Sequence, residues 1–171
     1  MRLFALSITA ALLATAAMAE PEQRFTPGPI ITVYGPTATV ADAAPLPEGV
    51  SFKVAFDVAE VAEEGKVNRR LESAARFLNL HARAGVPTEN MSLAIVVHGG
   101  ASANLVASDT NASQGLIEAL LESGVRIELC GQTAAYRGIS KTDLIPGIVI
   151  THSAMTSHAR LQQDGYTLNP F

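Results

Sequence analysis

The sequence predicts a three-layer α/β/α sandwich built on a mostly parallel sheet of about five strands, preceded by an N-terminal proline-rich arm. Three observations support this α/β fold class. From residue 50 onward short β-rich runs alternate with helical patterns, the connections are short, and one of the runs is apolar on both faces. Alternation of this kind produces parallel βαβ units with helices on both faces of a sheet.

Composition narrows the class of protein further. The chain has 171 residues, 48% hydrophobic and 16% charged, which suits one domain with a substantial core and excludes a disordered chain. The net charge is −4 and no basic stripe is present, so we expect no nucleic-acid partner. A single cysteine excludes an intrachain disulfide, and the four histidines lack a metal-binding spacing. We therefore expect no metal and no cofactor.

The first 19 residues have the features of a secretory signal peptide. Arg2 precedes an apolar run over residues 3–18, and Ala17 and Ala19 form a small-residue cleavage pattern. The run is shorter than a bilayer-spanning helix requires, which favours removal over a retained N-terminal anchor. We therefore expect an exported protein, located in a bacterial periplasm and free of the membrane after signal cleavage.

Residues 20–49 form the predicted arm. Six of the nine prolines fall in this segment, around one β-prone run at residues 30–34. Proline can neither continue a helix nor donate to a strand ladder, which favours an extended path across the domain or a neighbouring subunit. A partly ordered leader is the alternative. The α/β domain then covers residues 50–171.

The first three elements of the domain follow from local patterns. Residues 50–58 alternate between two sets of side chains, as in a strand. A helix is expected over residues 68–84, capped by Asn68 and ended by Gly85. Residues 91–97 are almost continuously apolar, as in a strand whose two faces are both covered.

The second half of the domain continues the alternation. A helix is expected over residues 112–123, with Asn111 as its cap and Gln114 in a capping-box-like position. The remaining predicted elements are a strand at 125–129, a short helix at 132–137, a strand at 147–151, a helix to 163 that Ser153 caps, and a strand at 166–168.

Three polar or reactive residues directly follow predicted strands: His98, Cys130 and His152. Ligands and reactive groups gather beyond the carboxyl ends of parallel strands, so these residues are candidates for a functional site. The order of the strands decides which of them are neighbours, and the sequence leaves that order open. Cys130 also precedes the first turn of a helix, where unpaired backbone amides favour a thiolate. A buried, inert cysteine is the alternative.

Other residues have supporting roles in this interpretation. His98 can exchange a proton with a neighbouring thiolate or stabilise it. A candidate loop for an anion or ligand comprises Gly99, Gly100, Gly131 and Gln132. His81 and His158 lie on or beside apolar helical stripes and are interpreted as structural or surface residues.

Several segments in combination closely resemble the exported branch of the DsrE-like family. They are Ala94-Ile-Val-Val-His-Gly-Gly100, Gly124-Val-Arg-Ile-Glu-Leu-Cys-Gly-Gln-Thr133, Arg137-Gly-Ile139, Ser153-Ala-Met-Thr156 and Leu161-Gln-Gln-Asp-Gly-Tyr166. The likeness covers roughly residues 51–170.

The resemblance implies a parallel α/β/α domain that assembles into homo-oligomers, trimers or hexamers. In sulfur-relay members of this family, a cysteine at the position of Cys130 carries sulfur as a persulfide, and an Arg-Gly pair like Arg137-Gly138 follows two turns later. The expected function is a periplasmic sulfur carrier that receives sulfane sulfur on Cys130 and passes it to a partner protein. A non-catalytic oligomeric binding module and a thiol redox protein remain as alternatives.

Overall fold

The computed structural model describes residues 25–171, and the predicted signal peptide at residues 1–19 lies outside them. In this part of the chain five strands form one sheet in the order β4-β3-β2-β1-β5, and every neighbouring pair is parallel. The strands are β1 (Phe52–Val58), β2 (Met91–Val97), β3 (Arg126–Cys130), β4 (Val149–Thr151) and β5 (Thr167–Asn169). The predicted parallel sheet of about five strands is therefore confirmed.

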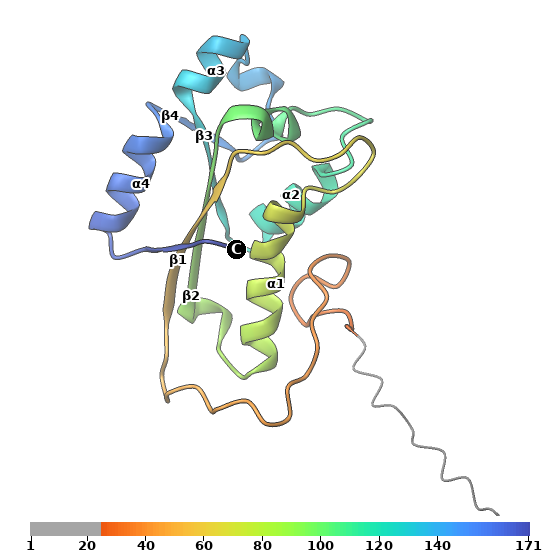
Figure 1. Cartoon of the computed structure of the whole chain (residues 1–171), viewed down its shortest axis with the longest axis vertical. Coiled ribbons are helices and arrows are strands. Elements are labelled where there is room, and N and C mark those ends of the chain that lie inside the picture. Colours follow the sequence, from red (N-terminus) through yellow and green to blue (C-terminus); the bar gives the residue numbers. More distant parts are fainter. Residues whose placement is uncertain (1–24) are drawn as a thin grey trace, which may run out of the picture.

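Helices cover both faces of this sheet (Figure 1). α1 (Arg69–Arg83) and α2 (Gln114–Glu122) lie together on one face, and α4 (Ala154–Gln163) lies on the other. The short α3 (Gly131–Arg137) begins directly where β3 ends. These layers form the α/β/α sandwich that the sequence predicts, because each helix must bury its apolar stripe against the sheet.

The two faces of the sheet differ in their chemistry. Ile127 and Leu129 of β3 point into the main core beneath α1 and α2, together with the buried Phe56 of β1. The apolar cluster on the α4 face is much smaller and consists of Ala55, Ala94, Val96 and Leu161. Residues that alternate with those of the main core, such as Asp57 and Cys130, therefore lie on the α4 side of the sheet.

The helix caps agree with the sequence at α1 and differ at α2. The side chain of Asn68 accepts hydrogen bonds from the backbone N–H groups of Arg70 and Leu71, at 3.0 and 3.4 Å. The prediction of Asn111 as the cap of α2 is wrong, because Ser113 occupies that position. Asn111 instead donates two hydrogen bonds to backbone carbonyls of the preceding loop, and these fix the approach to α2.

The described part of the proline-rich segment, residues 25–49, folds back on α1. Asn79, a fully buried residue of α1, accepts hydrogen bonds from the N–H groups of Ile30 and Ile31 at 3.2 and 2.9 Å. Its amide group donates to three carbonyls of the same segment, at 2.9, 3.0 and 3.0 Å. Asn79 therefore makes most of the side-chain hydrogen bonds that attach the segment to its own domain, with Glu72 and Arg83 of α1 adding others, and the β-prone run at 30–34 forms no strand there.

Short 3-10 helices, which the sequence patterns do not predict, occupy several connections. They are η1 (Thr88–Asn90), η2 (Gly99–Leu105) and η3 (Lys141–Asp143). η2 follows β2 and turns the chain at the edge of the sheet where the strands end. Among the described residues, no helix combines the length and the apolar character that crossing a membrane requires.

Candidate functional site

A cavity of about 470 Å³ lies at the carboxyl ends of the strands. Three strands each supply one residue there: Asp57 near the end of β1, His98 directly after β2, and Cys130 at the end of β3. The rest of the lining comes from α3, α4 and the residue before α4, and consists of Gln132, Thr133, Ser153, Ala154, Met155 and His158. Parallel strands that end at one edge bring these distant parts of the sequence together.

Cys130 lies in the wall of this cavity with only 6% of its surface exposed. Its sulfur accepts hydrogen bonds from the backbone N–H groups of Thr133, Ala154 and Gln132. Two of these donors belong to the first turn of α3 and the third is the first residue of α4, so two helix N-termini converge on one sulfur atom. Burial by itself would raise the pKa of Cys130, but these donors outweigh it and hold the pKa below its usual value.

Thr133 adds a further donor through its hydroxyl group. The backbone N–H of Gly99 donates to Thr133 Oγ1 at 3.2 Å, and the hydroxyl in turn donates to the Cys130 sulfur. Because Gly99 occupies an acceptor position of the oxygen, the hydroxyl proton is available to the sulfur. This chain of hydrogen bonds connects the turn after β2 with the end of β3, and it favours the thiolate form.

Asp57 bridges two histidines in another part of the cavity wall. His158 Nε2 lies 2.7 Å from Asp57 Oδ1, and His98 Nε2 lies 3.2 Å from Asp57 Oδ2. One carboxylate thereby fixes imidazole rings that come from α4 and from the end of β2. Partial burial by itself would raise the pKa of Asp57, but the hydrogen bonds and positive charge of His158 and His98 hold it below the usual value.

The order of the strands decides which histidine meets the cysteine. β3 lies between β2 and β4, so His98 and His152 both follow strands adjacent to the one that ends in Cys130. His98 lines the cavity together with Cys130. The exposed side chain of His152 lines a separate cavity of about 180 Å³, and only its carbonyl approaches the site, where it accepts a hydrogen bond from Gln132 Nε2 at 3.4 Å.

The glycines after β2 serve the packing of the backbone. Gly99 has a positive φ of 54°, and both Gly99 and Gly100 lie against the carbonyl of Ala59. The N–H of Gly99 already donates to Thr133. Neither glycine belongs to the lining of the cavity, and Gly99 acts on the site through its hydrogen bond to Thr133.

The two remaining residues of the predicted ligand loop behave differently from each other. Gly131 lies so close to the carbonyl oxygen of Thr151 that no Cβ fits between α3 and β4. Gln132 lines the cavity beside Cys130. Arg137, the basic residue two turns down the same helix, is exposed and does not line it.

Sequence reasoning missed six of the nine residues that line the cavity, and Asp57, Thr133 and His158 are the three of them that carry chemical groups used in the site. Asp57 has a detectable signal, because it alternates with core residues near the end of a strand. The helical stripe that His158 shares with Leu161 predicts a structural or surface residue, but the structure places His158 against Asp57, 101 residues away in the sequence. The packing of α4 against the end of β1 creates this pair, and no local pattern reveals it.

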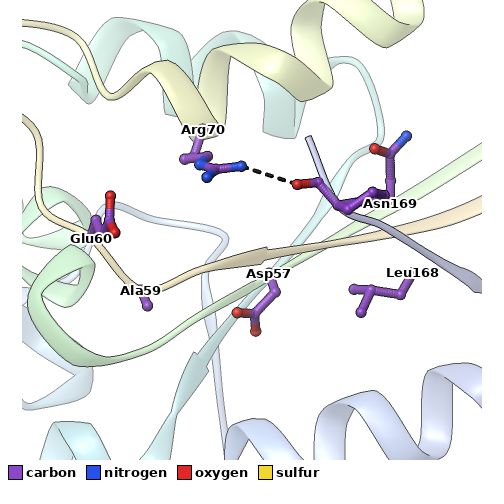
Figure 2. Close-up of a pocket in the computed structure, with 7 residues that line it drawn as sticks. Asp57, Ala59, Glu60, Arg70, Leu168 and Asn169 are labelled. Atoms are coloured by element: carbon purple, nitrogen blue, oxygen red, sulfur yellow. Dashed lines mark hydrogen bonds between the residues drawn. The ribbon is translucent and has the colours of Figure 1, made fainter.

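Asp57 also lines a second cavity, of about 300 Å³, which Figure 2 shows. Arg70 of α1 and Asn169 of β5 lie in its wall, and Arg70 donates a hydrogen bond to the carbonyl of Pro170 at 3.1 Å. The carboxylate of Asp57 points away from Arg70 in this view. Asp57 thus lines both cavities, and its carboxylate pairs with the histidines of the first one.

Among residues 25–171, no cluster of three or more His, Cys, Asp or Glu side chains is placed to hold a metal ion. The Nε2 atoms of both cavity histidines are directed at the Asp57 carboxylate. What the arrangement offers is a cysteine with a lowered pKa beside groups that can accept and donate protons.

These features define a class of protein: a parallel α/β/α domain with one cysteine of lowered pKa between a strand end and a helix N-terminus. A model of the DsrE/DsrF-like family matches residues 53–170, and the chain belongs to this family. The match contains the whole cavity lining and every strand except the first residue of β1.

Two solved structures have the same fold. A protein of unknown function, MTH1491 from Methanobacterium thermoautotrophicum, is 23% identical with a TM-score of 0.58, over 71% of this chain and all of that one. The ychN protein from E. coli is 21% identical with a TM-score of 0.52, over 70% of this chain and all of that one. A search of curated proteins found no match.

Proposed function

We propose that the protein is a sulfur carrier, which holds sulfane sulfur as a persulfide on Cys130 and passes it to a partner protein. The observation that carries this proposal is the set of hydrogen-bond donors around the Cys130 sulfur. They stabilise a thiolate, the form that attacks sulfane sulfur, and they suit an anionic persulfide equally well. Membership of the DsrE/DsrF-like family, which is linked to sulfur relay, supports the same function.

Loading of Cys130 moves one sulfur atom and one electron pair. The thiolate attacks the sulfane sulfur of a donor such as thiosulfate, a new S–S bond forms, and sulfite leaves with the electrons of the S–S bond that breaks. Unloading follows the same chemistry, because a partner thiolate attacks the outer sulfur and the Cys130 thiolate leaves. His98, which lines the same cavity, is our candidate for accepting the thiol proton before the attack.

Intact-mass measurement tests this proposal directly, because Cys130 is the only cysteine of the chain. Anaerobic incubation with thiosulfate or polysulfide should add sulfur to the native protein and none to Cys130→Ala, and dithiothreitol should remove it. If no adduct forms, the carrier function is wrong. A disulfide-linked species on non-reducing gels would instead favour a thiol redox protein, and a Cys130→Ala variant with unchanged binding partners would favour a binding module.

Export and assembly complete the proposed function. The signal-peptide features of residues 1–19 support a periplasmic location, where a sulfur acceptor would also have to lie. Fractionation of cells that express the full chain tests this, and a cytoplasmic product would contradict it. We also propose a trimer or hexamer. Light scattering coupled to gel filtration should report one of these sizes, and a monomer would refute it.

A further inference from the structure

A second charged cluster shares the cavity with Cys130, and none of its members is among the hydrogen-bond donors that lower the pKa of that cysteine. It consists of the Asp57 carboxylate and the imidazoles of His98 and His158, whose Nε2 atoms both face Asp57. In the described structure neither Nδ1 atom has a hydrogen-bond partner. A carboxylate that accepts from both Nε2–H groups therefore leaves each Nδ1 as a site for a proton. When both rings are protonated, the cluster carries one net positive charge and offers two N–H donors.

Access to the sulfur limits the size of its reaction partner. Cys130 is 6% exposed and is reached through a cavity of about 470 Å³, a volume that suits a small molecule. The side chain of Met155 lines the same cavity and is 80% exposed, so the cavity meets solvent beside it. The structure therefore favours a small first reactant over a thiol on the surface of a large protein.

The charges in the cavity also restrict which sulfur donor can reach Cys130. A thiolate and an anionic sulfur donor repel each other, and this repulsion is strong where little water screens it. A neighbouring cation removes the repulsion and stabilises the charge that develops on the leaving group. His98 and His158 are the titratable groups that can supply this cation inside the cavity lining.

We propose that the Asp57–His98–His158 cluster selects small anionic sulfane-sulfur compounds, of which thiosulfate is the simplest, as the donors that load Cys130. This inference rests on the proposed carrier function and adds the class of substrate to it. Asp57 is a positioning residue, because it orients both imidazoles, whereas the two histidines contact the anion. Anion preference increases as the pH falls, because the imidazoles gain protons while the ionised carboxylate continues to attract them.

All charged groups around the cluster enter this pH dependence. β1 supplies Asp57, the end of β2 supplies His98, and α4 supplies His158. The Cys130 thiolate faces them from the end of β3. The remaining charged groups, Glu60 and Arg70, lie beyond Asp57 in the second cavity. A test of the histidines therefore needs a measurement that does not depend on how much of Cys130 is ionised.

Paired alkylating reagents provide that readout. Iodoacetate and iodoacetamide react with the same thiolate and differ by one negative charge, so the ratio of their rate constants reports the charge of the cavity. For the native protein we expect the rate constant of iodoacetate, divided by that of iodoacetamide, to rise at least about fivefold when the imidazoles become protonated at low pH. His98→Gln and His158→Gln should each flatten the rise and slow loading by thiosulfate relative to iodoacetamide. His152→Gln, whose side chain lies outside the cavity, is the matched control and should behave as the native protein.

The outcomes separate this inference from the carrier function. A ratio that is independent of pH, or one that His152→Gln flattens as much as His158→Gln does, overturns the anion selection. Retained iodoacetamide reactivity shows that a variant is folded with its thiolate accessible. If thiosulfate and polysulfide leave no sulfur on Cys130 while the charge ratio behaves as expected, the carrier function fails and an anion-selective thiol site remains.

Discussion

Removing the Thr133 hydroxyl group should make Cys130 a weaker nucleophile. In Thr133→Val the side chain keeps its shape but no longer donates to the sulfur, while the backbone donors remain. A hydrogen bond to a charged group contributes about 1.5–3 kcal/mol, and about 1.4 kcal/mol changes an equilibrium tenfold. Little water reaches this sulfur to replace the lost donor, since 6% of the residue is exposed. We therefore expect the pKa of Cys130 to rise and the thiolate fraction at a pH below it to fall at least about tenfold.

The rate of alkylation by iodoacetamide as a function of pH measures this change. Thr133→Ser is the control, because it retains the hydroxyl and should titrate close to the native protein. Thr133→Val also leaves the N–H of Gly99 without its acceptor. The free energy of unfolding of this variant should therefore fall by about 1–3 kcal/mol. An unchanged alkylation profile in a folded Thr133→Val protein would refute the proposed role of the hydroxyl.

Four further perturbations test other parts of the structure. Asn79→Ala removes five hydrogen bonds to the N-terminal segment. It should lower the free energy of unfolding by roughly 2–5 kcal/mol in urea titrations and make residues 25–37 more sensitive to proteolysis. Unchanged values would show that Asn79 does not hold the segment on α1. Asp57 has a lowered pKa, so its contribution to stability is present above its unfolded pKa and is lost as the pH falls through its folded pKa. The free energies of unfolding of the native protein and of Asp57→Asn should therefore converge as the pH falls below about 4. A difference between them that stays constant with pH would contradict this prediction. Gly131→Ala should push α3 away from β4, which differential scanning calorimetry would report as a lower Tm, and an unchanged Tm would contradict the close approach. Glu128→Met removes a buried carboxylate whose Oε2 has no hydrogen-bond partner among the described residues and whose ionic partner, Arg126, is solvated. The free energy of unfolding should therefore rise by about 1–2 kcal/mol. A decrease would show that the carboxylate is needed.

Local sequence patterns were sufficient for most of the fold. The continuous apolar run at residues 91–97 has the bounds of β2, and Asn68 caps α1 as expected. Both follow from interactions between residues close in the sequence. The prediction of the α2 cap was wrong because local sequence does not distinguish Asn111 from Ser113, which are both good capping residues. The fold of the preceding loop decides between them.

The candidate site was only partly accessible to sequence reasoning. Cys130 and His98 could be found because Cys130 ends one strand and His98 directly follows another, and parallel strands end at one edge. Helical periodicity places His158 on a stripe but does not say what that stripe meets. The contact with Asp57 depends on how α4 packs across the sheet, which is a tertiary property. Thr133 likewise required the position of the Gly99 N–H.

The way in which α1 holds the N-terminal segment has a consequence for how freely that segment can vary. Asn79 recognises only main-chain atoms there, so the identity of the outward-facing Thr32 and Val33 is irrelevant to the attachment. Gly28 is the exception, because any larger residue would overlap the Asn79 amide. Homologous chains should therefore diverge at the outward positions while the asparagine and the glycine persist together.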